Sequence, residues 1–470
     1  MSKRFTIVNA IPYVNSRPHV GFALELIQSD TLARYHRAQG EEVVYTTGTD
    51  ENAVKNVQAA EKAGKPVKEF VDEHAEVFHK LNAALNISAD EFIRTTEERH
   101  VIGAQKLWKA CDAAGDIYKK SYQGLYCVGC EQFYTPKELV DGLCPEHKTK
   151  PELIEEENYF FRLSKYQDKL LQLLESDEIK ITPSSRKNEL VQFIKEGLED
   201  FSISRSNARA KNWGISVPGD DSQRVYVWFD ALTNYINALG YGTDEKKFET
   251  WWNDSYRTHM IGKGIGRFHA IYWPAMLLSA GVALPNEIFV HGYVTVDGEK
   301  ISKTLGNVID PFEVVQKYGV DPLRYYLLRE IPSSGDGDFS YAKLEARYTG
   351  DLANNLGNLV SRVNKLAEKI VISNQQIDQS VQEKIENAKT AYHAAIKQFK
   401  LHEALGHLWE LFTFGNQYIN EKAPWKTGDA VAVASTAHLI QEGAKLLEPF
   451  LPETAEKILQ GTPGMLFPKL

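Results

Sequence analysis

The first 47 residues follow a strand–helix–strand order, which restricts the possible folds more than any other feature of the chain. Residues 5–11 are apolar and partly β-branched, as is typical of a buried strand, and Pro12 ends them. Residues 20–39 have leucines among helix-forming residues, and residues 42–47 are again strand-like. Because two strands joined by a helix pair in parallel, the pattern predicts an α/β fold built on a parallel sheet.

The same alternation resumes later in the chain. Residues 224–229, 258–261 and 288–290 are strand-like with helical stretches between them, so we expect them in the same sheet. Residues 116–150 are rich in Cys, Gly and Tyr and predict a small inserted module, whereas residues 152–204 predict helix and loop. The sheet would therefore be interrupted by an insert.

The character of the sequence changes beyond about residue 340. Apolar residues recur there at helical spacing, for example at Leu352, Leu356, Leu359 and Val363, and no strand-like run interrupts them. We therefore predict an all-α helix bundle, with helical segments over 352–370, 381–398, 401–421 and 431–448.

Composition limits the class of protein. With 470 residues, 43% of them hydrophobic, the chain is long enough for about two to four globular domains. No run approaches the ~20 apolar residues of a bilayer span, and the N-terminus lacks a signal-peptide core, so we expect a cytoplasmic protein without a membrane partner. Four cysteines are too few for a disulfide framework, and Cys111 is expected to be a small buried hydrophobic residue.

The net charge of −9 would by itself argue against a nucleic-acid partner, because nucleic-acid-binding proteins usually carry a basic face. The charge is unevenly distributed, however. Residues 347–470 hold 13 Lys and Arg against 13 Asp and Glu, so the other 41 basic and 50 acidic residues account for the whole −9. A neutral C-terminal region remains compatible with RNA binding, with few phosphate contacts and low non-specific affinity.

Three cysteines and a histidine form a pattern suited to a metal ion. Cys127 and Cys130 are followed by Cys144 and His147, which gives C-x2-C-x13-C-x2-H, and two ligand pairs at this spacing can meet one tetrahedral ion. Four protein ligands leave no open position for water. The pattern therefore predicts one structural Zn²⁺ per chain, stabilising an insert too small for its own core. Chance clustering of cysteines in a loop is the alternative.

Two short segments are suited to bind phosphate. His19 and Gly21 stand where a helix follows the first strand, and the free N–H groups of a helix N-terminus favour anions. Residues 297–304 (DGEKISKT) place Lys300 and Lys303 three apart, so that both can neutralise one polyphosphate. Either segment alone would more simply be a surface loop, but the pair favours a nucleotide site.

On these residues, the sequence resembles the class I aminoacyl-tRNA synthetases, and more closely the short bacterial methionyl-tRNA synthetases with a single zinc. The HIGH motif of the family is matched by residues 19–22 (HVGF) and its KMSKS motif by residues 300–304 (KISKT). The likeness covers nearly the whole chain. The methionyl type is indicated by residues 10–13 (AIPY), 47–50 (TGTD), 226–231 (YVWFDA) and 268–274 (FHAIYWP).

The resemblance implies a Rossmann-like parallel-sheet catalytic domain that is split by a zinc-binding insert and followed by an all-α helix-bundle domain. The expected parts are the first catalytic half (1–115), a connective insert (116–204) with its zinc module (116–150), the second catalytic half (205–295), the KMSKS loop and linker (296–345), and an α-helical anticodon-binding domain (346–470).

The implied function is that of a methionine–tRNA ligase. L-Methionine and ATP, with Mg²⁺, would give methionyl-adenylate, and the methionyl group would pass to the 3′ end of tRNA(Met). Because the methionine carboxylate itself attacks phosphorus, catalysis would rest on positioning and charge stabilisation. The implied catalytic residues are His19, Lys300 and Lys303, and ATP would be bound by these with Gly21, Ser302 and Arg205.

Two further sets of residues follow from the resemblance. A methionine pocket needs one fixed anion, Asp50, beside an apolar hole whose aromatic residues suit sulfur contacts. The expected pocket consists of Ile11, Tyr13, Asp50, Trp228, Ala231, Leu232, Tyr235, Ile265, His269 and Trp273. The expected anticodon-binding residues are Asn358 and Arg362, on one helix face, with Pro424 and Trp425. Without the resemblance, these tryptophans would be interpreted as core or capping residues.

Three departures from the family pattern bear on activity. Phe22 replaces the last histidine of HIGH, KISKT keeps both lysines and a hydroxyl, and Gly264 stands where many relatives have aspartate. A degenerate paralogue that binds tRNA without activating an amino acid is therefore the alternative function, and a nucleotidyltransferase for a smaller substrate is a third. Because no set of β-strands follows the helical region, the resemblance implies a monomer.

Overall fold

The computed structural model describes residues 4–127, 129, 132–134, 136–146, 148–301, 306–373, 375–462 and 465–470. The chain divides into two compact units. Among the described helices, none combines the length and the apolar character that crossing a bilayer requires. Unit 1 comprises Met1–Pro18, Glu41–Lys80 and Ala89–Val290, and unit 2 comprises His19–Gly40, Leu81–Ser88 and His291–Leu470.

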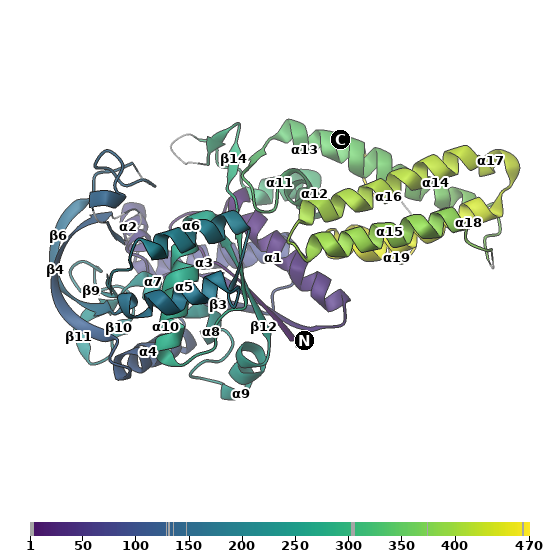
Figure 1. Ribbon diagram of the computed structural model, residues 1–470. Coiled ribbons are helices and arrows are strands. Elements are labelled where there is room, and N and C mark those ends of the chain that lie inside the picture. Colours follow the sequence, from purple (N-terminus) through teal and green to yellow (C-terminus); the bar gives the residue numbers. More distant parts are fainter. Residues whose placement is uncertain are drawn as a thin grey trace. The chain divides into compact units, whose positions relative to one another are not determined.

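Unit 1 is built on a six-stranded sheet with strand order β3-β2-β1-β12-β13-β7 (Figure 1). Strand β1 pairs in parallel with β2 and β12, β2 with β3, and β13 with β7, which confirms the predicted parallel α/β core. Residues 5–8 are buried, as a sheet covered on both faces requires. The strands are β1 (Arg4–Asn9), β2 (Glu42–Thr49), β3 (Glu91–Arg94), β7 (Lys180–Thr182), β12 (Tyr256–Gly262) and β13 (Glu287–His291).

Helices and short turns connect these strands. Cys111, on α4, is fully buried, as expected for a small hydrophobic residue. The connecting elements are α2 (Val54–Ala63), α3 (Val67–Ala84), α4 (Glu98–Ala113), η1 (Pro136–Glu138), η2 (Leu163–Tyr166), α5 (Gln167–Glu175), α6 (Ser184–Lys195), α7 (Val227–Leu232), α8 (Asn234–Asn237), α9 (Glu245–Phe248), η3 (Glu249–Asn253), η4 (Lys263–Ile265), η5 (Phe268–Tyr272) and α10 (Trp273–Ala280).

The prediction that residues 224–229 form a strand of the main sheet is wrong. Strand β11 (Asp220–Val225) pairs antiparallel with β9 (Ser204–Ser206) and β10 (Ser216–Val217) in a separate three-stranded sheet, and helix α7 follows it. A short apolar run fits a buried strand and a buried helical turn equally well, so the periodicity of the sequence does not separate them.

Residues 152–204 contain more strand than expected. Strand β6 (Glu152–Phe161) pairs antiparallel with β4 (Ile117–Cys127) along its length, in a sheet of order β5-β4-β6-β8. Glutamate is depleted in strands, so the glutamates of β6 argued against a strand at this position. The same region also supplies β7 to the main sheet. The other two strands of the insert are β5 (Gln132–Tyr134) and β8 (Phe201–Ser202).

Unit 2 contains the predicted helix bundle, and Figure 1 shows α15, α16 and α18 lying side by side in it. The stripe of Leu352, Leu356, Leu359 and Val363 is buried, as its helical spacing predicted. The bundle consists of the π-helix η6 (Tyr348–Gly357) with α14 (Asn358–Ala367), α15 (Gln379–Ile396), α16 (Leu401–Lys422), α17 (Pro424–Thr427), α18 (Ala430–Leu447) and α19 (Pro452–Leu459).

Helix α1 (Val20–Ala38) belongs to unit 2, although the strands before and after it belong to unit 1. Its buried Asp30 pairs with the buried Arg324 of α12 at 2.8 Å, and Arg324 also donates to the carbonyl of Phe450. Burial disfavours the charged carboxylate, but Arg324, Arg34 and the hydrogen bonds from Ser88 together outweigh it and lower the pKa of Asp30. This ion pair joins α1 to the C-terminal helices. The other elements of unit 2 are β14 (Val294–Val296), β15 (Glu299–Lys300), α11 (Pro311–Tyr318), α12 (Val320–Glu330), β16 (Gly337–Phe339) and α13 (Tyr341–Arg347).

Candidate active site

The imidazole of His19 caps the N-terminus of α1. The backbone N–H of Gly21 donates to His19 Nδ1 over 3.1 Å. Because Nδ1 accepts, the proton of the neutral ring lies on Nε2, where it can be donated to an anion. Burial lowers the pKa of His19, so the neutral ring prevails at neutral pH. The helix end therefore offers both its dipole and a directed N–H donor.

Gly21 is required by its neighbour His19. A Cβ atom at position 21 would stand 2.9 Å from His19 Cε1, so a side chain there would displace the imidazole. The same Cβ would lie 4.0 Å from Ile301 Cδ1. The two segments that the sequence suggested for phosphate, about 280 residues apart, are therefore neighbours in unit 2.

The KISKT segment begins on a hairpin formed by β14 and β15, whose turn passes through Gly298 at φ 78°. The carboxylate of Asp338, on β16, accepts the N–H of Gly298 over 2.8 Å and the hydroxyl of Thr295 over 2.7 Å. These hydrogen bonds, that of Gly298 foremost, lower the pKa of Asp338. Asp338, which the sequence did not single out, thus holds the turn before Lys300. The side chain of Lys300 and the whole of Ser302 and Lys303 lie outside the described residues.

Unit 1 brings together most of the side chains expected to form a methionine pocket. Trp228 and Ile265 pack against the apolar cluster that contains Tyr235 and Trp273, and Trp228 also shares a second cluster with Tyr13. Some members of this set are buried, and the others are half-buried and keep part of their surface exposed. The buried set is Asp50, Ala231, Leu232, Tyr235, His269 and Trp273, and the half-buried set is Ile11, Tyr13, Trp228 and Ile265.

His269 is held in one orientation by two hydrogen bonds. Its Nδ1–H donates to the carbonyl of Ile265 over 2.9 Å, and the Tyr235 hydroxyl lies 2.6 Å from Nε2, which accepts its proton. Burial lowers the pKa of His269 to about 4, so the ring is neutral under physiological conditions. The π-helix η5, which carries His269, is a rare geometry that often marks functional sites.

A second buried histidine, His259 on β12, was missed by the sequence reasoning. The indole N–H of Trp273 donates to His259 Nε2 over 3.1 Å, and the Tyr235 ring lies 4.7 Å from the His259 ring. Burial lowers the pKa of His259 well below its usual value. The aromatic residues around His259 are therefore uncharged. A polar residue within an apolar strand is the signal that could have identified His259.

Asp50 lies at the carboxyl edge of the parallel sheet, where ligands bind in open α/β folds. It follows β2 directly, forms a bridge with Tyr13, and is 4% exposed. Its backbone N–H donates to the carbonyl of Pro12, and its Oδ1 accepts the N–H of Asn52. The structure thus holds one carboxylate beside the aromatic cluster through Tyr13.

A buried polar network lies next to Asp50 and was also missed. Asp230, in the apolar YVWFDA run, has one carboxylate oxygen 2.5 Å from His100 Nε2, and the other accepts from Asn52 Nδ2 over 2.7 Å. Asn237 Nδ2 donates to the carbonyl of His100 over 3.1 Å. Buried polar groups are costly unless paired, and this network fixes Asn52, whose N–H contacts Asp50.

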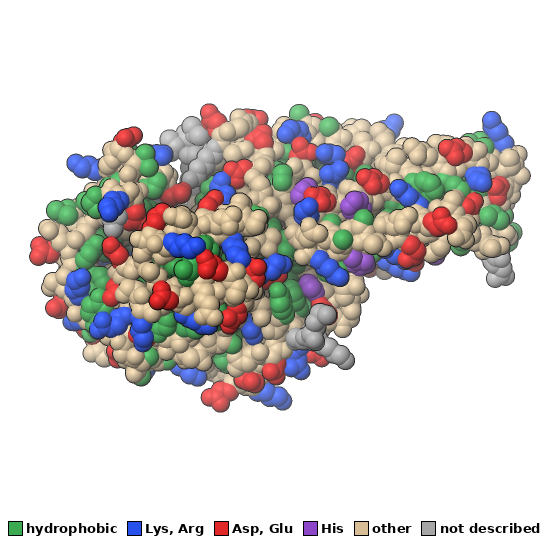
Figure 2. All heavy atoms as spheres, in the orientation of Figure 1, with side chains coloured by type: hydrophobic (Ala, Val, Ile, Leu, Met, Phe, Trp, Pro, Cys, Tyr) green, Lys and Arg blue, Asp and Glu red, His purple; other side chains and the backbone are tan. Residues whose placement is uncertain are grey.

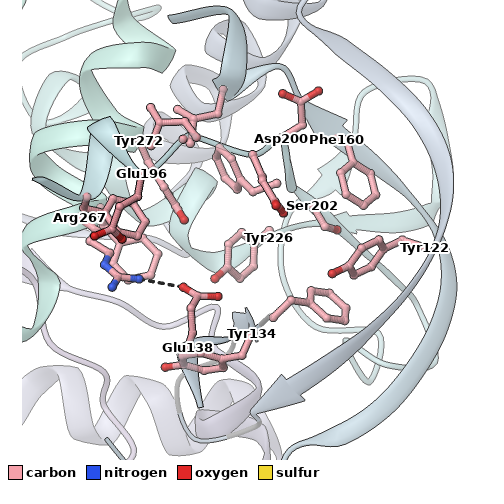
Figure 3. A pocket seen from close by; sticks show the side chains of 18 of the residues that line it. Tyr122, Tyr134, Glu138, Phe160, Glu196, Asp200, Ser202, Tyr226, Arg267 and Tyr272 are labelled. Atoms are coloured by element: carbon pink, nitrogen blue, oxygen red, sulfur yellow. Dashed lines mark hydrogen bonds and ion pairs between the residues drawn. The ribbon is translucent and has the colours of Figure 1, made fainter. Parts of the chain in front are cut away.

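Arg205 lies in the wall of a cavity of about 510 Å³ within unit 1 (Figure 3). The guanidinium is 4.2 Å from the centre of the Tyr226 ring and 5.2 Å from that of Phe133, so it stacks among aromatic rings. Its Nη1 donates to the Ser202 hydroxyl and the Ser204 carbonyl. The expected contact of Arg205 with ATP remains a prediction.

The expected zinc ligands are described only in part. Cys127 and Cys144 are buried in one small cluster with Tyr134, and Cys130 and His147 lie outside the described residues. Among the residues that the structure describes, no three potential ligands form a metal-binding group. Two buried thiols in so small an apolar cluster are chemically suited to a soft cation.

The helix bundle carries the last expected set. Asn358 is exposed on α14, one turn from Arg362, whose Nη1 donates to Asn420 Oδ1 over 2.6 Å. Trp425 is 49% exposed, whereas Pro424 is buried. Asn420 was not anticipated, because only tertiary packing brings α16 beside α14. Figure 2 shows acidic and basic side chains interspersed on the visible face, without a dominant field of one sign.

Two family models together match nearly the whole chain. The model described as "tRNA synthetases class I (M)" matches residues 5–150 and 146–364, and that described as "Anticodon binding domain of methionyl tRNA ligase" matches residues 372–464. The division between the two models falls inside the helical region that the sequence had predicted.

Named relatives agree with these models. The methionine–tRNA ligase of Thermotoga maritima is 41% identical across 97% of this chain and 75% of its own length. That of Brucella suis is 42% identical across 97% of this chain and 91% of its own. A solved structure of Mycobacterium tuberculosis methionyl-tRNA synthetase in complex with methionyl-adenylate matches with a TM-score of 0.94 and 37% identity, and covers 100% of both chains.

Proposed function

The chain belongs to the class I tRNA synthetase (M) family, and on this premise we propose that it is a methionine–tRNA ligase. It activates L-methionine with ATP to methionyl-adenylate and pyrophosphate, and then transfers the methionyl group to the 3′ end of tRNA(Met). The observation that carries the proposal is the proximity of the His19–Gly21 turn to Ile301, which joins the two phosphate-binding segments in one place.

Methionine binds in unit 1. The carboxylate of Asp50 takes the ammonium group, and the half-buried Tyr13, Trp228 and Ile265 cover the side chain. Aromatic rings favour contacts with a thioether sulfur by roughly 0.3–1.5 kcal/mol. His269 is neutral and is held by Tyr235, so the buried side of the pocket carries no charge. Ile11, Ala231, Leu232 and Trp273 complete the pocket.

The activation step needs no protein nucleophile. The methionine carboxylate attacks the α-phosphorus of ATP, the bond to the β-phosphate oxygen breaks, and pyrophosphate leaves. Catalysis is therefore positioning and charge stabilisation. His19 donates its Nε2–H to a phosphate oxygen, and Gly21 leaves space for the ring. Lys300, Ser302 and Lys303 bind the departing pyrophosphate, and Mg²⁺ accompanies ATP.

The transfer step needs the correct tRNA. Trp425 stacks on an unpaired anticodon base, while Asn358 and Arg362 contact base edges and Pro424 supports the indole. Exposed aromatic and amide side chains are suited to unstacked loop bases. Arg362 is oriented for this role by Asn420.

Cys127, Cys130, Cys144 and His147 would together hold a Zn²⁺ ion. Its chemistry is structural, because four protein ligands leave no position for a substrate. The buried thiols of Cys127 and Cys144 support this assignment. Thiolate ligands persist in a reducing compartment, so we place the protein in the cytoplasm, and we expect a monomer by light scattering.

The test is methionine-dependent exchange of pyrophosphate into ATP, with the zinc content measured on the same protein. Lys303→Ala should lower kcat of the exchange by about 10²- to 10³-fold with little change in KM for methionine, because the lysine acts on developing charge. Lys317→Ala removes an exposed lysine of unit 2 and serves as the matched control.

Absence of exchange in the zinc-loaded wild type would overturn the proposal. If the same protein still bound tRNA(Met), the result would identify a paralogue that binds tRNA without activating methionine. Equal losses of kcat and methionine affinity in Lys303→Ala would remove the assigned role of that lysine.

A further inference from the structure

Asp230 is a buried carboxylate that has no role in the reaction described above. It lies on α7 between Trp228 and Ala231, two residues of the proposed methionine pocket, and its side chain is fully buried. Burying a carboxylate is costly unless hydrogen bonds compensate for the lost water, so the partners of Asp230 indicate why the fold keeps it.

His100 binds one oxygen of the Asp230 carboxylate. The Nε2 atom of His100 lies 2.5 Å from Asp230 Oδ1. The side-chain amide of Asn237 donates to His100 Nδ1 over 3.3 Å and to the His100 carbonyl over 3.1 Å. Because Nδ1 accepts, the proton of the imidazole lies on Nε2 and is donated to Asp230. His100, which is itself fully buried, therefore orients the carboxylate.

Asn52 binds the other oxygen of the carboxylate. Its Nδ2 donates to Asp230 Oδ2 over 2.7 Å and to the carbonyl of Thr95 over 3.1 Å. The backbone N–H of Asn52 in turn donates to Asp50 Oδ1 over 3.3 Å. One side chain thus connects Asp230 to the carboxylate that we assign to the methionine ammonium group.

Glu51, between Asp50 and Asn52, has a different set of partners. Its carboxylate accepts from the Arg94 guanidinium over 2.7 and 2.9 Å, and its N–H donates to Thr95 Oγ1 over 2.8 Å. Arg94 therefore compensates the charge of Glu51. These bonds fix residues 50–52 to the end of β3, whereas the bond from Asn52 to Asp230 joins the same residues to α7.

The bond between Asn52 and Asp230 connects the two ends of the proposed methionine pocket. Asp50 is assigned to the ammonium group, whereas α7 carries Trp228, which is assigned to the side chain and stacks on Phe268 with ring centres 3.8 Å apart. The groups of a binding site must be held within about 0.5 Å of the productive geometry by supporting hydrogen bonds. Asp230 is placed to supply such support.

We propose that Asp230 is a positioning residue for methionine binding. Through Asn52 it holds the Asp50 carboxylate where the ammonium group of an amino acid bound against α7 can reach it. The inference rests on the proposed ligase function. Asp230 itself contacts no substrate in this arrangement, so its replacement should weaken the ammonium contact and spare the binding of ATP.

The first experiment measures methionine-dependent exchange in Asp230→Asn. Asparagine keeps the size of the side chain but accepts from one of the two donors and sets its own N–H against the other. KM for methionine should rise about tenfold, as for one lost hydrogen bond to a charged group, while kcat and KM for ATP change less than about twofold.

Asp116→Asn is the matched control. Asp116 is another fully buried carboxylate of unit 1, and it accepts from Lys165 over 2.7 Å and from Ser279 over 2.8 Å. Its replacement should leave KM for methionine unchanged. A rise in KM equal to that of Asp230→Asn would mean that any buried carboxylate has this effect through the fold, and would overturn the inference.

Asn52→Ala tests the same connection from its other end. Asn52 is half-buried, and alanine leaves the backbone N–H to Asp50 in place, so this variant decides if Asp230→Asn melts at a lower temperature than Asp116→Asn. Asn52→Ala should also raise KM for methionine. Added to Asp50→Asn, neither Asn52→Ala nor Asp230→Asn should cause a further loss. A further loss of the same size would overturn the inference.

A binding comparison tests the ammonium contact without catalysis. Methylthiopropylamine, which is methionine without its carboxylate, keeps the ammonium group, whereas methylthiobutanoate, which is methionine without its amino group, lacks it. By calorimetry, Kd for the amine should rise about tenfold in Asp230→Asn, and Kd for the acid should change less than about twofold. Equal weakening of both ligands would show a general disturbance of the pocket and overturn the inference.

The ligase proposal and the role of Asp230 can fail separately. Absence of exchange in the wild type would end the ligase proposal, while Kd for the amine would still decide whether Asp230 positions Asp50. Normal exchange in the wild type, with unchanged amine affinity in both Asp230→Asn and Asn52→Ala, would overturn the inference alone.

Discussion

The proposed methionine pocket and the proposed anticodon-binding surface both depend on aromatic side chains but expose them in opposite ways. In the pocket, Trp273 and His269 are fully buried, and their polar atoms are engaged by His259 and Tyr235. On the helix bundle, Trp425 is 49% exposed. The aromatic residues of one site are enclosed by the fold, and the other site presents a single ring to solvent.

The difference follows from the two ligands. A methionine side chain is small and apolar, so its recognition requires an enclosed, largely apolar pocket. An anticodon base has a π face and polar edges, so an exposed ring and nearby donors suffice. Changes in the pocket should therefore affect both reaction steps, and changes on the surface only the step that needs tRNA.

Asp50→Asn should have the largest effect, because it removes the only charge assigned to the methionine ammonium group. Loss of one partner of a buried charge pair costs about 4 kcal/mol, so kcat/KM for methionine should fall near 1,000-fold in both exchange and charging. Asp177→Asn, an exposed aspartate paired with Lys187, is the control. A defect confined to charging would show that Asp50 does not bind the methionine ammonium group.

Lowering the pH should have the second-largest effect, because it should reduce the free energy of unfolding through the buried His269. The pKa of His269 is about 4 in the folded protein against 6.5 unperturbed, so the unfolded chain takes up a proton first. The contribution of His269 to the free energy of unfolding is fully present above about pH 6.5 and is lost as the pH approaches 4. Between pH 7.5 and pH 5 the loss is about 2 kcal/mol. Urea unfolding followed by tryptophan fluorescence measures the loss.

The matched variant is His269→Gln, which has no titrating ring at this position and should show a smaller loss between the same two pH values. His259, whose pKa burial also lowers, acts in the same direction and is present in both proteins. Identical pH profiles for the two proteins would mean that His269 is protonated as readily in the folded as in the unfolded chain.

Trp425→Ala should impair only the tRNA step. Loss of one base–aromatic stack, about 2 kcal/mol, predicts a fall near 30-fold in kcat/KM for tRNA(Met) and unchanged methionine-dependent exchange. Trp425→Phe retains a ring and should recover most of the loss. If exchange fell together with charging, the indole would have to be assigned to packing of the helix bundle.

Asn420→Ala should have the smallest effect. It frees the guanidinium of Arg362, which Asn420 orients through one exposed hydrogen bond, so charging should fall about threefold. Charging should fall further in Arg362→Ala. If the Asn420 amide acts only through the Arg362 guanidinium, the double variant should charge tRNA at the same rate as Arg362→Ala. Additive losses would show that Asn420 contacts the RNA itself.

Local patterns predicted the elements that are stabilised by their own periodicity. The helices around Leu352, Leu359 and Val363 lie where the apolar spacing placed them, and β1 and β2 lie in the expected parallel sheet. Residues 226–229 were misassigned because a short apolar run has no period of its own. Strand β6 was missed because cross-strand pairing with β4 overrides the low β propensity of its glutamates.

The residues of the candidate site differ in the same way in how well the sequence predicted them. Motif residues such as His19 and Gly21 were identified because their chemistry depends on neighbours one or two positions away. Supporting residues such as Asp338 and Asn420 were missed, because their partners are 40 or more positions distant in sequence. The cavity beside Arg205 has no local signal, since its walls come from several separate segments.

The sequence by itself determined the parallel-sheet and helix-bundle architecture, the family, and the motif residues, because periodicity and short spacing are encoded between near neighbours. Tertiary structure alone decided that Ile301 meets Gly21, that His259 and Tyr235 hold the neutral aromatic residues, and that Arg205 lies buried among aromatic rings in the wall of a cavity. Burial and the protonation state of a histidine depend on which distant segments pack together, and only the folded chain specifies that packing.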